Sequence, residues 1–115
     1  DFPVYSEQLT PPADVVEHQN KWEILLDMPG VDNDKINLEW KDGVLEIRAE
    51  RPEIKCEEGS TLRRNERRCG EFIRHFRLEG VKEDEISATL HNGVLKIEIP
   101  KREEKVAKKI PVKVG

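Results

Sequence analysis

Residues 86–100 carry the pattern that most constrains the fold, two alternating segments joined by the dipeptide Asn92-Gly93. Apolar side chains occupy every second position before this dipeptide, and the alternation resumes after it. A period of two indicates strands with one buried face, and Asn-Gly between such strands favours a type I′ turn. Pro100 ends the second strand because it has no N–H to donate to a ladder. The sequence therefore predicts a β-hairpin here.

A second copy of this pattern lies fifty residues earlier in the chain. Residues 30–47 align with residues 80–97 at a constant difference in numbering, as between residues 31 and 81. A solenoid needs at least three repeats to bury its faces, so two copies favour a closed sandwich. The identical pairs are Gly30/Gly80, Val31/Val81, Asp34/Asp84, Ile36/Ile86, Gly43/Gly93, Val44/Val94, Leu45/Leu95 and Ile47/Ile97.

The rest of the chain reads as further short strands, with no stripe of helical period. Residues 1–12 have no periodicity and predict an extended lead-in, and residues 51–60 a long polar connection. Residues 101–109 carry seven charges and are expected to be solvated. We therefore predict an all-β fold, an immunoglobulin-like antiparallel β-sandwich. Besides the second hairpin, the expected strands are residues 13–18, 22–28, 36–40, 44–50, 61–68 and 71–78.

Composition limits the partners and the compartment. Of the 115 residues 38% are charged, and the net charge of −4 argues against general affinity for nucleic acid. No apolar run approaches the roughly 18 residues that cross a bilayer, and no signal-peptide pattern is present, so we expect no membrane partner. Cys56 and Cys69 are interpreted as two reduced thiols of a cytoplasmic protein, with a disulfide in a secreted protein as the alternative.

Motifs for catalysis are missing from the sequence. It contains no GxxxxGK phosphate loop, no GxSxG elbow and no HExxH pair. His18, His75 and His91 fall in separate segments without the spacing of metal ligands. We therefore predict no enzyme, no cofactor and no metal site.

Two groups of arginines have more than one interpretation. Arg74 shares strand parity with Phe72 and Phe76, which points its side chain toward the apolar side. A guanidinium there needs a carboxylate partner, unless its long stem lets it reach solvent. The arginines of residues 63–68 favour an ion-paired edge over a phosphate patch, because acidic residues are interleaved with them.

Several motifs together resemble one family. Residues 88–95 are similar to the A-x-x-x-N-G-V-L signature of the small heat-shock proteins. Residues 29–31, 42–45 and 72–78 match further parts of an α-crystallin domain, and the tail Ile110-Pro111-Val112 resembles the terminal I-x-I motif. Two departures are Glu79, where the family usually has proline, and Cys69, where it often has an aromatic residue. The resemblance runs from about Pro11 to Val112.

This resemblance implies a domain organisation and a function. It implies an α-crystallin domain over residues 11–100, a remnant of an N-terminal arm over 1–10 and a C-terminal extension over 101–115. Family members are ATP-independent holdase chaperones that form homo-oligomers and bind non-native client proteins. In the bacterial, archaeal and plant branch, which the long loop favours, dimers form by exchange of a strand in that loop.

The resemblance also implies three sets of site residues. The long loop and the tail favour a holdase over the alternative, a p23-like co-chaperone adaptor that binds a folded partner, since that sandwich has neither. The implied dimer interface is Leu62, Arg63, Arg64, Glu66, Arg67 and Arg74; the oligomerisation tail is Ile110, Pro111 and Val112; the groove for tails or clients is Ile36, Leu38, Trp40, Ile86, Ala88 and Leu90.

Overall fold

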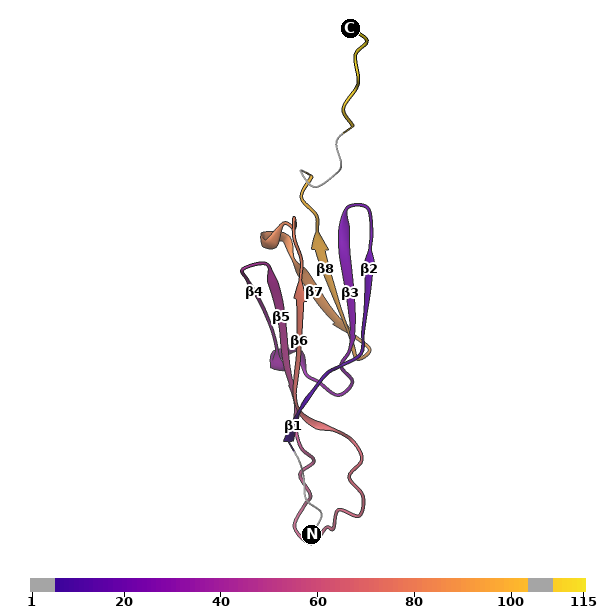
Figure 1. Cartoon of the computed structure of the whole chain (residues 1–115). Helices are drawn as coiled ribbons and strands as arrows, with labels where there is room; N and C mark the ends of the chain where they lie inside the picture. The colour runs from indigo at the N-terminus through magenta and orange to yellow at the C-terminus, as the bar shows by residue number, and fades with distance from the viewer. Residues whose placement is uncertain (1–5, 104–108) are drawn as a thin grey trace.

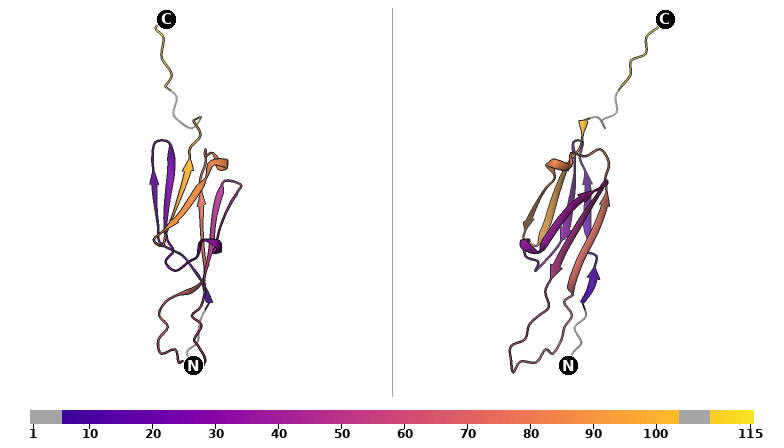
Figure 2. Two further views of the ribbon diagram at one scale, coloured as in Figure 1. Left: turned by 180° about the vertical axis from the view of Figure 1, so that it is seen from behind. Right: turned by 90° about the vertical axis from the view of Figure 1, so that its left-hand side faces the viewer.

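The computed structural model describes residues 6–103 and 109–115, with the backbone alone for residues 6–9. Within these residues two four-stranded sheets pack face to face (Figures 1 and 2). Short 3₁₀ turns, η1 (Asn33–Lys35) and η2 (Glu83–Glu85), precede β4 and β7. The predicted all-β sandwich is confirmed. The first sheet has the order β1 (Ser6–Leu9), β6 (Cys69–Arg77), β5 (Val44–Arg51), β4 (Ile36–Lys41); the second has the order β2 (Ala13–Glu17), β3 (Lys21–Asp27), β8 (Val94–Pro100), β7 (Ser87–His91).

The core lies between the inner strands of the two sheets. Side chains of β5 and β8 alternate between buried and more exposed, as the period of two predicts. Ile47 and Ile97, equivalent residues of the two repeats, are both fully buried. The other core side chains come from β3, β5, β6, β8 and the adjoining loops: Ile24, Leu26, Met28, Val31, Leu45, Ala49, Phe72, Val81, Leu95 and Ile99.

Both predicted hairpins are present and both turn as expected. At the second turn φ is 50° at Asn92 and 76° at Gly93, and at the first it is 51° at Asp42 and 79° at Gly43. A type I′ turn needs positive φ at both central residues, which Asn, Asp and Gly tolerate best. The hairpins belong to opposite sheets, β4–β5 to one and β7–β8 to the other.

The same difference of fifty relates β3 to β6, each of which precedes the hairpin of its own repeat. Each hairpin is completed by the one of these strands that belongs to the other repeat. β6 follows the first hairpin in the chain and pairs with β5, whereas β3 precedes it and pairs with β8. The turn glycines accept equivalent hydrogen bonds: Leu78 N–H donates to the Gly43 carbonyl at 3.0 Å, and Met28 N–H donates to that of Gly93 at 2.7 Å. The two repeats therefore interlock around one core.

Two predicted segments differ from the structure. Residues 6–9, expected within a lead-in without strands, form β1 and pair in parallel with β6 from Cys69 to Phe72. Such a short backbone pairing leaves no periodic pattern in the sequence. Residues 61–68, expected as a strand, form none. A strand needs a neighbouring edge, and in the described chain no other strand lies beside this segment.

Candidate functional site

A groove runs between β4 and β7, the last strands of their respective sheets. Its volume is about 600 Å³. The inner face of β4 is half-buried at Ile36 and Leu38, because the outermost strand of a sheet lacks a neighbour on one side. The residues that line the groove are Val31, Asp32, Asn33, Ile36, Leu38, Ala88, Thr89, Leu90 and Leu95.

Four of the six predicted groove residues line this groove, namely Ile36, Leu38, Ala88 and Leu90. Trp40 instead lines a second cleft of about 370 Å³ together with Leu78, Val81 and Arg102. Ile86 is half-buried and packs against the core. Val31 and Leu95 also line the groove but were not predicted. Each belongs to an identical pair of the repeat, Val31/Val81 or Leu45/Leu95, and identity does not tell which member of a pair lines the groove.

The predicted tail motif contacts nothing in the described chain. Ile110 and Val112 are 82% and 93% exposed, and Val114, two residues further on, is fully exposed. All three side chains share one parity along the extended segment. An exposed apolar row of this kind matches the spacing of the inward-facing residues on β4, since both repeat every two residues.

Five of the six predicted dimer residues, all except Arg74 on β6, lie on a loop that projects from one end of the sandwich (Figures 1 and 2). Leu62 is half-buried, whereas Arg63, Arg64, Glu66 and Arg67 are exposed. Arg64 and Glu66 form an exposed ion pair at 3.7 Å, the kind of pair that contributes little to stability. The charged interleaving expected from the sequence is therefore present, without a second strand to pair with.

Arg74 faces inward, as its parity predicts, but the predicted carboxylate partner is not found within the described chain. The guanidinium donates a hydrogen bond to the Pro11 carbonyl at 3.0 Å and lies 5.1 Å from the centre of the Phe76 ring. Among the described residues no carboxylate forms an ion pair with it. Because the side chain is only half-buried, a carbonyl and an aromatic face suffice in place of a counter-charge.

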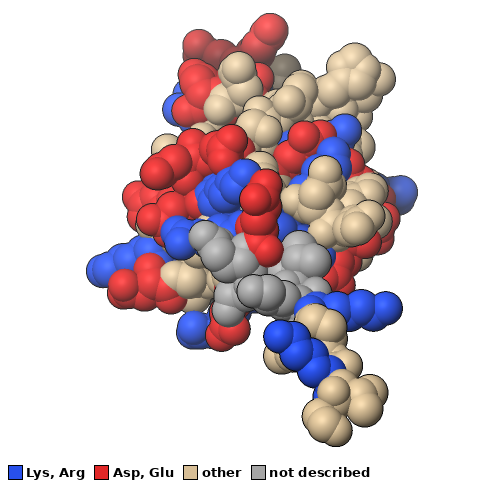
Figure 3. All heavy atoms as spheres, turned by 90° about the horizontal axis from the view of Figure 1, so that it is seen from above, with Lys and Arg blue, Asp and Glu red and all other residues tan. Residues whose placement is uncertain are grey.

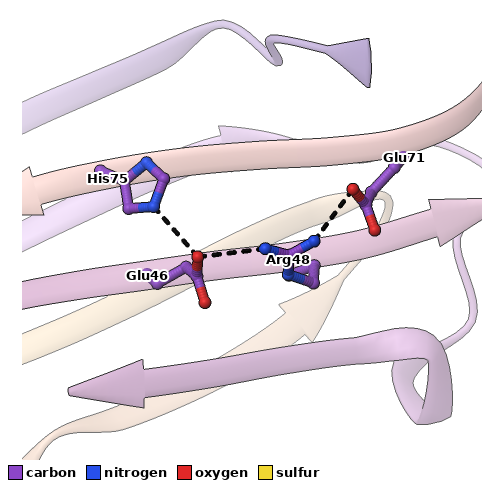
Figure 4. Close-up of polar contacts among 4 residues, drawn as sticks. All are labelled: Glu46, Arg48, Glu71 and His75. Atoms are coloured by element: carbon purple, nitrogen blue, oxygen red, sulfur yellow. Dashed lines mark hydrogen bonds and ion pairs between the residues drawn. The ribbon is translucent and has the colours of Figure 1, made fainter. Parts of the chain in front are cut away.

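Four polar side chains cross the outer face of β5 and β6 (Figure 4). Glu46 accepts a hydrogen bond from Arg48 at 3.2 Å and lies 3.0 Å from His75 Nε2, while Arg48 pairs with Glu71 at 3.0 Å. Hydrogen bonds first from His75 and then from Arg48 hold the pKa of Glu46 below its usual value. The hydrogen bonds that Arg48 donates, first to Glu71 and then to Glu46, raise the pKa of Arg48.

This cross-strand row contains no nucleophile beside a base. Over residues 6–103 and 109–115, no three His, Cys, Asp or Glu side chains gather closely enough to hold a metal. Cys56 is an exposed free thiol and Cys69 a buried one. At the end of the sandwich where β8 finishes, acidic and basic side chains are interspersed (Figure 3). Within the described residues no helix is both long and apolar enough to span a membrane.

Comparisons with known proteins agree on one family. A model described as the Hsp20/alpha crystallin family matches residues 14–114. The 17.6 kDa class II heat shock protein of Arabidopsis thaliana is 44% identical over 110 residues, which cover 90% of this chain and 71% of that protein. A small heat-shock protein from Xylella fastidiosa, solved by crystallography, has a TM-score of 0.73 at 36% identity, covering 94% of this chain and all of that one.

A class I relative is matched over a smaller part. The 17.6 kDa class I heat shock protein of Helianthus annuus is 45% identical over 80 residues, which cover 68% of this chain and 52% of that protein. The chain thus spans about half the length of this relative.

Proposed function

This chain belongs to the Hsp20/alpha crystallin family, the small heat shock proteins, which are non-enzymatic chaperones, and we propose that it is an ATP-independent holdase. As a holdase it binds unfolding proteins through apolar surface and prevents their aggregation. The single observation that carries the proposal is the apolar groove between β4 and β7, next to two open sheet edges. Such edges and grooves accept extended apolar segments of other chains.

The family match does not support the alternative of a p23-like co-chaperone. The relatives named above are heat shock proteins, and the match extends through the long loop into the C-terminal extension. An adaptor for one folded partner would also leave the exposed row of Ile110, Val112 and Val114 without a role. A holdase that assembles through its tails gives this row a binding site.

The proposed assembly has two levels. Dimers form when the loop of residues 61–68 pairs with the open edge of β2 of a second copy, where Val15 and Val16 are 47% and 40% exposed. Larger oligomers form when the tail of one copy enters the groove of another. The Xylella fastidiosa relative has a distinct high order structure, which supports assembly beyond the dimer. We place the protein in the cytoplasm, in keeping with its two free thiols.

The affinity of one tail for one groove is expected to be weak. Burial of Ile110 and Val112 removes on the order of 200 Å² of apolar surface from water, or about 5 kcal/mol at about 25 cal/mol per Å². The loss of freedom on binding offsets most of this gain. A dimer with two tails and two grooves nevertheless assembles, because multivalency raises the effective concentration. Weak single contacts also leave grooves transiently open to client segments.

The experiment compares the chain with its Ile110→Ala/Val112→Ala variant, using Lys113→Ala as a matched control in the same tail. The chain should suppress light scattering by a heated, thermolabile reporter enzyme without ATP. The double variant should fall to dimers by light-scattering mass, while Lys113→Ala keeps the assembly.

Two outcomes count against the proposal. A reporter that aggregates equally with and without the chain excludes the holdase activity. A double variant that keeps the wild-type mass excludes docking of the tail. Both variants change only side chains that are exposed in the single chain, so neither should unfold the sandwich.

A further inference from the structure

Lys101 follows β8 directly, and its side chain is fixed although its segment was expected to be solvated. The ammonium donates hydrogen bonds to Glu17 Oε2 at 2.7 Å and to the His18 carbonyl at 2.8 Å. It also lies 5.1 Å from the centre of the Trp22 ring. Only 19% of the side chain is exposed. Charge-assisted hydrogen bonds and a cation–π contact together attach the C-terminal extension to the β2–β3 hairpin.

The backbone around Lys101 is held from both sides. Its N–H donates to the Asn20 carbonyl at 2.9 Å, and the Arg102 N–H donates to the Gly80 carbonyl at 2.7 Å. Arg102 Nε donates to the Val81 carbonyl at 2.9 Å. Residues 101–102, the root of the extension, therefore continue the line of β8 beyond Pro100, its last residue.

The tail is long enough to reach the groove of its own subunit. Ile110 lies eight residues beyond Arg102, a span of at most about 27 Å when extended. Arg102 lines the same cleft as Trp40. Leu38 and Ile36 follow Trp40 on the inner face of β4, at about 7 and 14 Å from it. Length alone would thus allow the tail to dock in its own groove.

The direction of the root opposes that outcome. A tail that entered its own groove would have to reverse the chain between the root and Ile110. Residues 103–109 contain no Gly, Pro, Asn or Asp, the residue types that favour reversals. Figure 1 shows residues 109–115 beyond the end of the sandwich at which β8 finishes. The reversal would be easiest at the root itself, which the contacts of Lys101 hold straight.

We propose that Lys101 is a positioning residue for assembly. By holding the root in line with β8, it directs the tail away from its own groove and into the groove of another copy of this chain. The inference rests on the proposed docking of the tail. Loss of the Lys101 contacts lets the chain turn at the root, so that the tail fills its own groove and no longer links dimers.

The test uses Lys101→Met, which keeps an apolar stem beside Trp22 and removes the ammonium. Glu17→Gln weakens the same contact from an exposed side chain, so it decides the matter if Lys101→Met does not fold. Lys96→Met is the matched control, because Lys96 lies on β8 and pairs with Glu98 at 3.2 Å without touching the root. Light-scattering mass, thermal melting and binding of a labelled peptide with the sequence of residues 109–115 are measured for each.

Lys101→Met should lower the weight-average mass at least about twofold, toward dimers, and Glu17→Gln should lower it less. Lys96→Met should keep the wild-type mass. The peptide should bind Lys101→Met at least about tenfold more weakly than it binds Ile110→Ala/Val112→Ala, because the tail of the former competes from the same chain. Lys101→Arg, which keeps a cation, should restore most of the mass.

Three results would overturn the inference. If Lys101→Met and Glu17→Gln keep the wild-type mass while Ile110→Ala/Val112→Ala falls to dimers, the tail docks but Lys101 does not direct it. If Lys101→Met loses mass yet binds the peptide as well as the tail variant, its groove is empty and the tail has not turned back. If the tail variant itself keeps its mass, docking fails and the role of Lys101 fails with it.

Discussion

The two repeats build nearly the same backbone but carry opposite charges on their outer faces. Glu46 and Arg48 of β5 correspond to Lys96 and Glu98 of β8, so acid and base exchange places. The charges on the neighbouring strands are inverted too: Arg48 pairs with Glu71 of β6 at 3.0 Å, whereas Glu98 lies 3.7 Å from Lys21 of β3. On the inner faces of the same two strands, by contrast, Leu45 and Ile47 are repeated as Leu95 and Ile97.

The inverted charges do not decide which strands pair. In the structure Glu98 lies directly opposite Glu23, and Glu71 lies directly opposite Glu50, although like charges across a strand pair are destabilising. Lys96, which lies 3.6 Å from Glu23 and 3.2 Å from Glu98, offsets the first of these contacts. The outer faces therefore accommodate the observed pairing rather than select it.

The strands that complete the hairpins, β3 and β6, differ in charge at one position of their inner faces. Ile24 of β3 lies opposite Ile97, but its equivalent in the other repeat, Arg74 of β6, lies opposite Ile47. The shared core is therefore closed by an apolar side chain on the β3 side and by a half-buried guanidinium on the β6 side. The difference leaves the β6 side of the sandwich more polar within.

The largest expected effect tests whether the two repeats contribute equally to the core. Ile47→Ala and Ile97→Ala each remove a fully buried side chain and should each lower the free energy of unfolding by about 2–5 kcal/mol. Chemical denaturation measures both. A loss below about 1 kcal/mol at either position would mean that one repeat does not pack as described.

Replacement of the turn glycines by alanine should destabilise the two hairpins to different degrees. Gly43→Ala and Gly93→Ala both force a side chain into positive φ, at about 1–2 kcal/mol each. A Cβ at Gly93 would also lie 3.3 Å from Pro29 Cα, whereas one at Gly43 would meet nothing closer than the Leu78 carbonyl at 3.7 Å. Gly93→Ala should therefore melt at the lower temperature. Equal melting temperatures would contradict the tighter packing of the second turn.

Arg74→Ala addresses the inner face of β6. Loss of the hydrogen bond to Pro11 and of the contact with Phe76 should lower the free energy of unfolding by about 1–3 kcal/mol. Removal of one partner of a buried ion pair would cost more, about 3–5 kcal/mol. Thermal and chemical unfolding at a concentration that keeps the assembly intact distinguish the two, and a loss in the higher range would reveal a carboxylate supplied by another subunit.

The smallest expected effect concerns the outer faces and is seen as a dependence of the melting temperature on pH. Hydrogen bonds from His75 and Arg48 lower the pKa of Glu46, and a hydrogen bond from Lys96 lowers the pKa of Glu98. A carboxyl group whose pKa is lower in the folded state stabilises the fold at any pH above its unfolded-state pKa, near 4.5. This contribution is lost as the pH falls through the folded-state pKa. Glu46→Gln and Glu98→Gln should each have a slightly lower melting temperature than the wild type at pH 7. In strong acid their melting temperatures should equal that of the wild type. A deficit that persisted in acid would point to packing rather than charge.

The sequence by itself determined the hairpins, the type I′ turns at Asp42-Gly43 and Asn92-Gly93, and which faces of β5 and β8 are buried. These features depend on residues only a few positions apart, where alternation and the backbone preferences of Asn, Asp and Gly decide the conformation. The motifs of the family resemblance come from the same segments. Four of the nine residues that line the groove, Ile36, Leu38, Ala88 and Leu90, could therefore be predicted.

Only the tertiary structure decided which third strand completes each hairpin, where β1 pairs, and what surrounds Arg74 and Lys101. The contacts of Lys101 join residues more than eighty positions apart, and that of Arg74 with Pro11 joins residues sixty-three apart. A parity rule places Arg74 inside but cannot name a carbonyl from a distant loop as its partner. Nor can it tell that Trp40 opens onto a different cleft from Leu38, because the opposite wall of each cleft comes from the second repeat.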